Sequence, residues 1–167
     1  MVWGCISMSA KSVGWASRIN VKGTMDTSLY LQVLEDEMQK SVDWCFDKSD
    51  KGEWFFQQDN ATCHKSQAVL KFLNDKKIKL LDHPPQSPDL NPIESLWNHI
   101  KHQINKKHIM NGVEDIWSAF EEELNKIPPD YCEKLIRSMP ERIQAVLKAK
   151  GVKDQQNIKH KINCCFW

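Results

Sequence analysis

The sequence predicts an α/β fold whose sheet mixes parallel and antiparallel strands. Strand and helix patterns alternate through the middle of the chain, and helix patterns alone fill its last third. The chain also opens with two short strand patterns around a turn, which is typical of a hairpin and adds an antiparallel edge. With 167 residues, the chain has the length for one hydrophobic core of ordinary size.

Two strands, a helix and a further strand are expected in the first part of the chain. Residues 2–7 and 13–20 are predicted to be the strands of the hairpin. Asp26 or Thr27 can cap the N-terminus of a helix, because apolar side chains recur at helical spacing after them. The aromatic run within residues 54–58 predicts a buried strand.

The next segment combines regular elements with a proline-rich connection. Apolar spacing predicts a helix over residues 65–74 and a strand over residues 78–81. Residues 83–92 hold four prolines, which predicts a stiff, extended crossing and not a regular element. Asn91 followed by Pro92 is a strong helix start, with asparagine at the N-cap and proline at the first helical position.

The last third of the chain is predicted to be helical. Residues 113–127 show a long amphipathic pattern, and two shorter helices follow over residues 131–139 and 141–150, parted by Pro140. Residues 152–167 show little periodicity, so we expect this tail to be poorly ordered.

The overall charge gives no signature of nucleic-acid binding, since the net charge is +1 and the isoelectric point is about 7.6. The distribution is uneven, however, because residues 134–167 hold eight basic and two acidic side chains. A solvated helix face with a basic tail is the favoured explanation of this pattern, and a DNA-binding surface is the alternative. The candidate DNA-binding residues are Lys134, Arg137, Arg142, Lys148 and Lys150.

Several classes of protein are not expected from this sequence. No apolar run approaches the roughly 20 residues that a membrane span needs, so no membrane association is predicted. The first residues lack the pattern of a signal peptide, which predicts a protein that is not secreted. The six cysteines lack zinc-ligand spacing and are expected to be free thiols in a reducing compartment.

Two carboxylates stand out as candidate ligands of a hard cation. Asp59 follows the aromatic strand, and Glu94 lies in the first turn of the helix that begins after Asn91. Brought together by a fold, they would form an oxygen-rich site of the kind that holds Mg²⁺ for phosphodiester chemistry. Each also has a structural alternative, because Asp59 could stabilise a turn and Glu94 could bond back to the N-cap amide in a capping box.

The full sequence strings around these acids resemble the catalytic domain of Tc/mariner-type transposases, which are DDE-type DNA-cutting enzymes with a ribonuclease-H-like fold. The similar segments are residues 1–7 (MVWGCIS), 54–64 (WFFQQDNATCH), 84–97 (PPQSPDLNPIESLW) and 127–151 (IPPDYCEKLIRSMPERIQAVLKAKG). The 34 residues between the two acids match the spacing of the nematode-type branch. The resemblance therefore predicts a partial ribonuclease-H-like fold with C-terminal helices.

This resemblance implies a two-metal mechanism in which three carboxylates hold two Mg²⁺ ions. Such enzymes cut a transposon end from flanking DNA and join it to a new site, so the implied partners are transposon ends and target DNA. Asp59 matches the second catalytic acid and Glu94 the third. Asn60 and His64 match motif positions and could shape the site. The implied location is the nucleus, with the cytoplasm as the alternative.

The first catalytic aspartate of the family precedes the strand that residues 2–7 resemble. We therefore expect residues 1–151 to be a partial catalytic domain without the central strand, and residues 152–167 to be a divergent tail. Unpaired strand edges would favour self-association. Eight other acids precede the strand of Asp59 and are expected not to reach the site, since they lie in helix and loop: Asp26, Glu35, Asp36, Glu37, Asp43, Asp47, Asp50 and Glu53.

The sequence leaves the function of the chain open among three interpretations. By resemblance it is a DNA endonuclease and strand-transfer domain for transposition, but with two of three acids it is expected to be inactive alone. The first alternative is a non-catalytic DNA- or protein-binding remnant of a transposase. The second alternative is a decayed gene product without a selected role.

Overall fold

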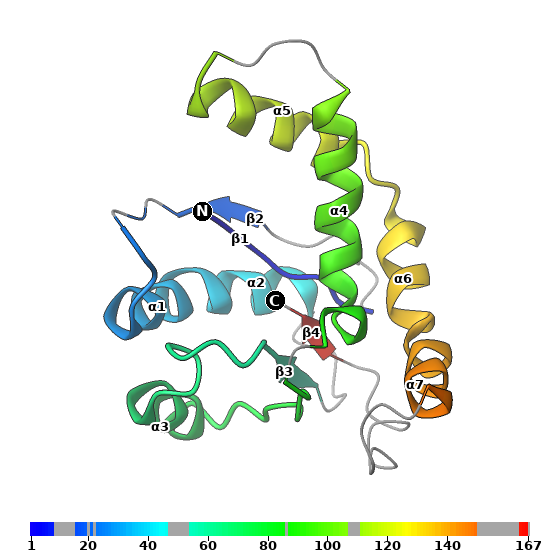
Figure 1. The fold of residues 1–167 in the computed structure, drawn as a ribbon. Helices are drawn as coiled ribbons and strands as arrows, with labels where there is room; N and C mark the ends of the chain where they lie inside the picture. The colour runs from blue at the N-terminus through cyan, green and yellow to red at the C-terminus, as the bar shows by residue number, and fades with distance from the viewer. Residues whose placement is uncertain are drawn as a thin grey trace.

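The computed structural model describes residues 1–8, 16–19, 21, 23–46, 54–85, 87–106, 111–149 and 164–166. Helices and short strands follow one another along the chain (Figure 1). Their order is β1 (Val2–Gly4), β2 (Ala16–Arg18), α1 (Thr27–Val33), η1 (Leu34–Met38), α2 (Gln39–Cys45), β3 (Phe55–Gln57), α3 (Gln67–Asp75), η2 (Pro88–Leu90), α4 (Pro92–Asn105), α5 (Val113–Asn125), α6 (Pro129–Arg137), α7 (Met139–Lys148) and β4 (Cys164–Phe166).

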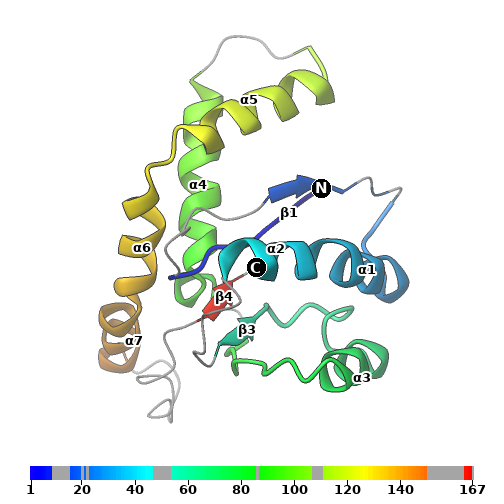
Figure 2. The same ribbon diagram turned by 180° about the vertical axis from the view of Figure 1, so that it is seen from behind.

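The strands lie between two layers of helices, and adjacent strand residues enter different cores. Phe56 belongs to the hydrophobic cluster that contains Tyr30 of α1 and Leu34 of η1, whereas Phe55 belongs to the cluster built on α4. Because successive strand side chains point to opposite faces, both faces of the strand layer are covered. The front and back views agree, with α1, α2 and α3 on one side of the strands and α4, α5 and α6 on the other (Figures 1 and 2).

The predicted hairpin is confirmed, although its strands are shorter than the sequence suggested. β1 and β2 pair in antiparallel register, with Val2 opposite Arg18. β3 also forms at the aromatic run, but the predicted strand over residues 78–81 is reduced to one parallel bridge between Phe56 and Leu80. Lys79 and Leu81 supply only two backbone hydrogen bonds to Phe56, which is too little pairing for a full strand.

A strand also forms within the predicted tail. β4 pairs in parallel with β3, with Phe55 opposite Cys164 and Gln57 opposite Phe166. The sequence pattern did not predict a strand at residues 164–166. The physical reason is that the second edge of β3 offers backbone groups that an extended segment can satisfy.

The first helical segment is capped as predicted and then changes its winding. Asp26 is the N-cap of α1, and its carboxylate accepts a hydrogen bond from the Leu29 amide at 2.8 Å. Residues Leu34–Met38 adopt the wider π-helical winding, which side-chain periodicity did not predict. Helix α2 continues this segment to Cys45.

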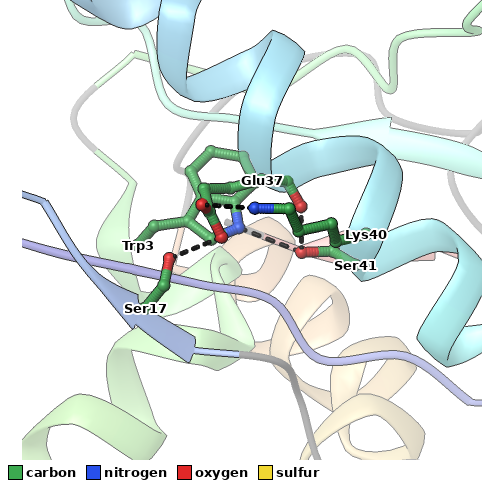
Figure 3. Close-up of polar contacts among 5 residues, drawn as sticks. All are labelled: Trp3, Ser17, Glu37, Lys40 and Ser41. Carbon is green, nitrogen blue, oxygen red and sulfur yellow. Dashed lines mark hydrogen bonds and ion pairs between the residues drawn. The ribbon is translucent and has the colours of Figure 1, made fainter.

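A polar cluster attaches the hairpin to this helical segment (Figure 3). The Trp3 indole donates to Ser41 Oγ at 3.0 Å, and Ser17 Oγ donates to Glu37 Oε2 at 2.8 Å. Lys40 contacts the other carboxylate oxygen of Glu37 at 3.1 Å. The hairpin is thus held to one helix layer by hydrogen bonds as well as by the hydrophobic core.

The C-terminal helices agree with the sequence except near two prolines. The proline-rich connection contains a short 3-10 turn, η2, where only an extended crossing was expected. Helix α7 begins at Met139, so Pro140 lies in its first turn and does not separate two helices. Proline is tolerated there because the first amides of a helix have no partner within the helix.

Within the described residues, no helix is both long and apolar enough to cross a membrane.

Candidate active site

The structure brings Asp59 and Glu94 to the same pocket. This pocket has a volume of about 460 Å³ and lies where β3 ends, the proline-rich connection passes and α4 begins. Its lining residues are Asp59, Asn60, Ala61, Lys65, His83, Pro85, Ser87, Pro88, Asn91 and Glu94. Two carboxylates separated by 34 residues of sequence therefore border one polar cavity.

Asp59 is held in an ionised form by its neighbours. Its Oδ1 lies 2.7 Å from Nδ1 of His64 and accepts a hydrogen bond from the Ala61 amide at 2.9 Å. The hydrogen bond from His64 is the main cause that lowers the pKa of Asp59, and the Ala61 amide and the charge of His83 act in the same direction. The Ala61 contact shows that Asp59 does form the turn suggested by the sequence. Both contacts involve Oδ1, so among the described residues neither of them occupies Oδ2.

A buried polar chain supports the histidine that holds Asp59. The side chain of His64 is 3% exposed, whereas that of Asp59 is 58% exposed. The Tyr30 hydroxyl donates to Gln58 Oε1 at 2.6 Å, and Gln58 Nε2 donates to the His64 carbonyl at 3.2 Å. The Tyr30 ring also packs on the His64 ring, with centroids 4.0 Å apart, and burial raises the pKa of Tyr30 well above its usual value.

The other flank of the site is attached through Gln57 and Asn60. Gln57 is buried, and its amide nitrogen donates to the Leu90 carbonyl and lies close to His83 Nδ1, at 3.1 Å in each case. Asn60 donates to the His83 carbonyl at 2.6 Å. Burial lowers the pKa of His83, which favours the neutral ring whose Nδ1 can accept from Gln57. These contacts fix the proline-rich connection against the end of β3.

Glu94 does not take the capping role that its position allows. Asn91 is the N-cap of α4, as predicted, but its amide donates to the Pro88 carbonyl at 3.1 Å. A capping box would require that amide to bond with the Glu94 carboxylate. Turn η2 satisfies it instead, and Glu94 is one of the residues that line the pocket.

Among the residues that the structure describes, none of the other upstream acids borders this pocket. Asp26 caps α1, Glu37 contacts Ser17 and Lys40, and Asp43 accepts from Gln39. Glu35 and Asp36 lie in η1, and Asp47, Asp50 and Glu53 fall outside the described residues. Across the described part of the chain, no group of three or more His, Cys, Asp or Glu side chains could hold a metal ion.

The candidate DNA-binding cations are in different environments. Lys134 pairs with Asp130 and Arg137 with Glu133, each one helical turn away on α6. Lys148 is exposed near the end of α7, and Lys150 lies outside the described residues. Arg142 instead reaches Ser95 and Asp89 near the start of α4.

Sequence reasoning missed four residues that build the site: Tyr30, Gln57, Gln58 and His83. The two glutamines were visible as polar residues at the end of a buried strand, where a polar side chain requires a partner. Since adjacent strand residues point to opposite faces, one glutamine reaches the connection and the other reaches Tyr30. The sequence contains no signal that identifies those partners.

This arrangement agrees with comparisons to known proteins. Residues 3–117 match the family described as DDE superfamily endonuclease. The chain belongs to this family. The transposase of transposable element Tcb1 from Caenorhabditis briggsae is 37% identical over 152 residues, which cover 90% of this chain and 52% of that protein. This DDE-family chain thus spans about half the length of the curated relatives it matches.

Solved structures establish the fold of the DDE-family chain. The catalytic domain of Mos1 transposase, determined with raltegravir and Mn, superposes with a TM-score of 0.73 at 19% identity, covering 84% of this chain and 71% of that one. The Mos1 mariner paired-end complex with Mn gives a TM-score of 0.72 at 20% identity, covering 84% and 41%. The predicted mixed α/β fold of a transposase catalytic domain is therefore confirmed.

Proposed function

We propose that this chain is the part of a Tc1/mariner-type transposase that carries two of its catalytic carboxylates, and that it serves DNA cleavage and strand transfer in transposition. The observation that carries the proposal is the shared pocket of Asp59 and Glu94. The family membership and the transposase relatives support the same reaction class.

The residues of the pocket fit a hard divalent cation. Asp59 is kept ionised by His64, Glu94 is free of the helix cap, and both offer the oxygen ligands that Mg²⁺ and Mn²⁺ prefer. Bound there, such an ion would activate the attacking oxygen or stabilise the leaving oxygen of a phosphodiester. The Mos1 structures that contain Mn support this choice of metal. With two carboxylates, we expect one ion bound weakly by the chain alone.

The proposed substrate is DNA at a transposon end, and the proposed location is the nucleus. Lys65 borders the pocket and is exposed, so it can approach a backbone phosphate near the two acids. Lys148 offers a further exposed charge on α7. The paired-end complex of Mos1 supports DNA as the partner.

Manganese binding tests the carboxylate assignment directly. We expect the purified chain to bind Mn²⁺, measured by electron paramagnetic resonance, and Asp59→Asn and Glu94→Gln each to weaken that binding at least tenfold. Asp82→Asn removes an exposed acid that does not border the pocket and is the matched control. Equal loss in all three variants, or none in the first two, would refute the site.

A non-catalytic DNA-binding remnant is the second candidate function. The observation that favours it is that the described residues bring only two acids to the pocket, without a third group for a metal cluster. DNA binding that is unchanged by chelation of divalent metals, and unaffected by Asp59→Asn, would support this alternative.

A further inference from the structure

The side chain of Arg142, on α7, extends to the segment that begins α4 and contacts it. Its Nη1 donates to the Ser95 hydroxyl at 3.0 Å and to the Asp89 carbonyl at 3.2 Å. Its Nε donates to Ser138 Oγ at 2.8 Å, which fixes the guanidinium against α7. Ser95 directly follows Glu94, and Asp89 lies in turn η2. One side chain therefore spans the two segments on either side of the helix start.

Apolar packing brings α7 to the same turn. Leu90 of η2 is buried against Met139 and Ile143, which lie one turn apart on α7. Gln57 of β3 donates a hydrogen bond to the carbonyl of this leucine. The turn before Glu94 is thus held between the strand that precedes Asp59 and the helix that carries Arg142.

The contacts of Arg142 differ from those of the neighbouring cations. Lys134 pairs with Asp130, and Arg137 pairs with Glu133. In each pair the acid lies four residues earlier on α6. Exposed pairs of this kind contribute little to stability or to tertiary structure. Arg142 instead joins residues 47 and 53 positions away in the sequence by two hydrogen bonds, and its third hydrogen bond, to Ser138, is local. All three acceptors are uncharged oxygens. The guanidinium of Arg142 therefore makes its described hydrogen bonds within the protein.

We propose that Arg142 is a positioning residue for Glu94, and that it acts by fixing the first turn of α4 against η2 and α7. This inference rests on the proposed function, since Glu94 matters as a metal ligand only there. It replaces the DNA-contact role that the basic C-terminal sequence suggested for this arginine. Lysine cannot reproduce all of these contacts, because its single nitrogen cannot stand both at the Nη1 position, which donates to Ser95 and Asp89, and at the Nε position, which donates to Ser138.

The experiment compares Arg142→Lys and Arg142→Ala with the wild-type chain by NMR spectroscopy. Backbone amide signals of Glu94 and Ser95 report the geometry of the helix start, and Mn²⁺ titration reports metal binding through paramagnetic broadening at Glu94 and Asp59. Arg18→Ala is the matched control, since Arg18 also makes a long-range contact, to Glu114 at 2.7 Å, away from the pocket.

We expect both Arg142 variants to shift the Glu94 and Ser95 signals and to weaken Mn²⁺ broadening at Glu94 about tenfold, the low end for loss of a group that supports a metal ligand. Arg18→Ala should change neither. Should Arg142→Ala fail to fold, Arg142→Lys and Ser95→Ala test the same contacts, and each should shift the Glu94 signal.

Two outcomes would overturn the inference. One is wild-type Mn²⁺ broadening in Arg142→Lys with unchanged Glu94 signals. The other is a loss of DNA binding in Arg142→Ala that Arg142→Lys restores, again without a change at Glu94, because that result assigns the arginine to phosphate contact. Absence of broadening at Asp59 and Glu94 in the wild-type chain would instead overturn the proposed function, while the Glu94 and Ser95 shifts would still decide whether Arg142 fixes the helix start.

Discussion

At the scale of single residues, two adjacent glutamines organise the site from opposite sides: Gln57, the last residue of β3, and Gln58, which follows it. Gln57 holds the proline-rich connection, and Gln58 holds the segment of His64. Both are buried, so their hydrogen bonds form where water cannot replace a lost partner. The carboxylate of Asp59 is thus fixed by residues that do no chemistry themselves.

Gln57→Ala should destabilise the chain because it leaves the Leu90 carbonyl buried without its donor. The expected loss is about 1–3 kcal/mol in the free energy of unfolding, measured by chemical denaturation. Gln67→Ala, at an exposed position of α3, is the control and should change stability by no more than about 0.5 kcal/mol. Equal effects of the two substitutions on the free energy of unfolding would show that the hydrogen bond to Leu90 does not stabilise the fold.

His64→Phe should raise the pKa of Asp59, since the hydrogen bond from His64 is the main cause that lowers it. A carboxyl whose folded pKa is depressed stabilises the fold above its unfolded pKa, and this contribution is lost as the pH falls through the folded pKa. In the variant this contribution should be smaller, and its loss should be complete at a higher pH. NMR titration of the Asp59 carboxyl carbon in metal-free buffer measures the shift. An unchanged titration curve would contradict the assigned cause.

At the scale of elements, β4 covers one edge of β3 whose backbone groups would otherwise be open to pairing with another chain. Phe56 uses its amide and carbonyl to bond with Lys79 and Leu81, so the amides of Phe55 and Gln57 point toward the edge that β4 covers. The sequence suggested exposed edges and self-association. The structure places a segment of the same chain on one of those edges.

Removal of residues 164–167 should expose that edge of β3. We expect faster hydrogen exchange at the Gln57 amide than in the full chain, while the Phe56 amide, which faces Lys79, serves as an internal control. The free edge should also promote concentration-dependent self-association, detected by analytical ultracentrifugation. Unchanged exchange at Gln57 would show that β4 does not cover this edge in solution.

At the scale of the whole molecule, three layers place the end of β3 beside the start of α4, and so bring the two acids to one pocket. The described residues bring no third acid there. A two-metal reaction needs ligands for both ions, and each ~1.4 kcal/mol added to the barrier slows a reaction tenfold.

The purified 167-residue chain should therefore not nick transposon-end DNA with Mg²⁺ or Mn²⁺. Any DNA binding should decrease steeply with salt, since phosphate contacts release counterions. A nicking assay on a labelled duplex, with Asp59→Asn as the control, measures the first expectation. Metal-dependent cleavage that disappears in that variant would mean that another acid completes the site.

The sequence by itself determined most of the helices, the hairpin, the buried strand before Asp59 and the helix cap at Asn91. These features depend on side chains within a few residues, where propensity and periodicity act. The tertiary structure alone decided that Arg142 joins Ser95, that the Asn91 amide bonds with Pro88 and leaves Glu94 to the pocket, and that residues 164–166 pair with β3. Such contacts depend on how the layers pack, because local sequence preferences do not specify which distant groups meet.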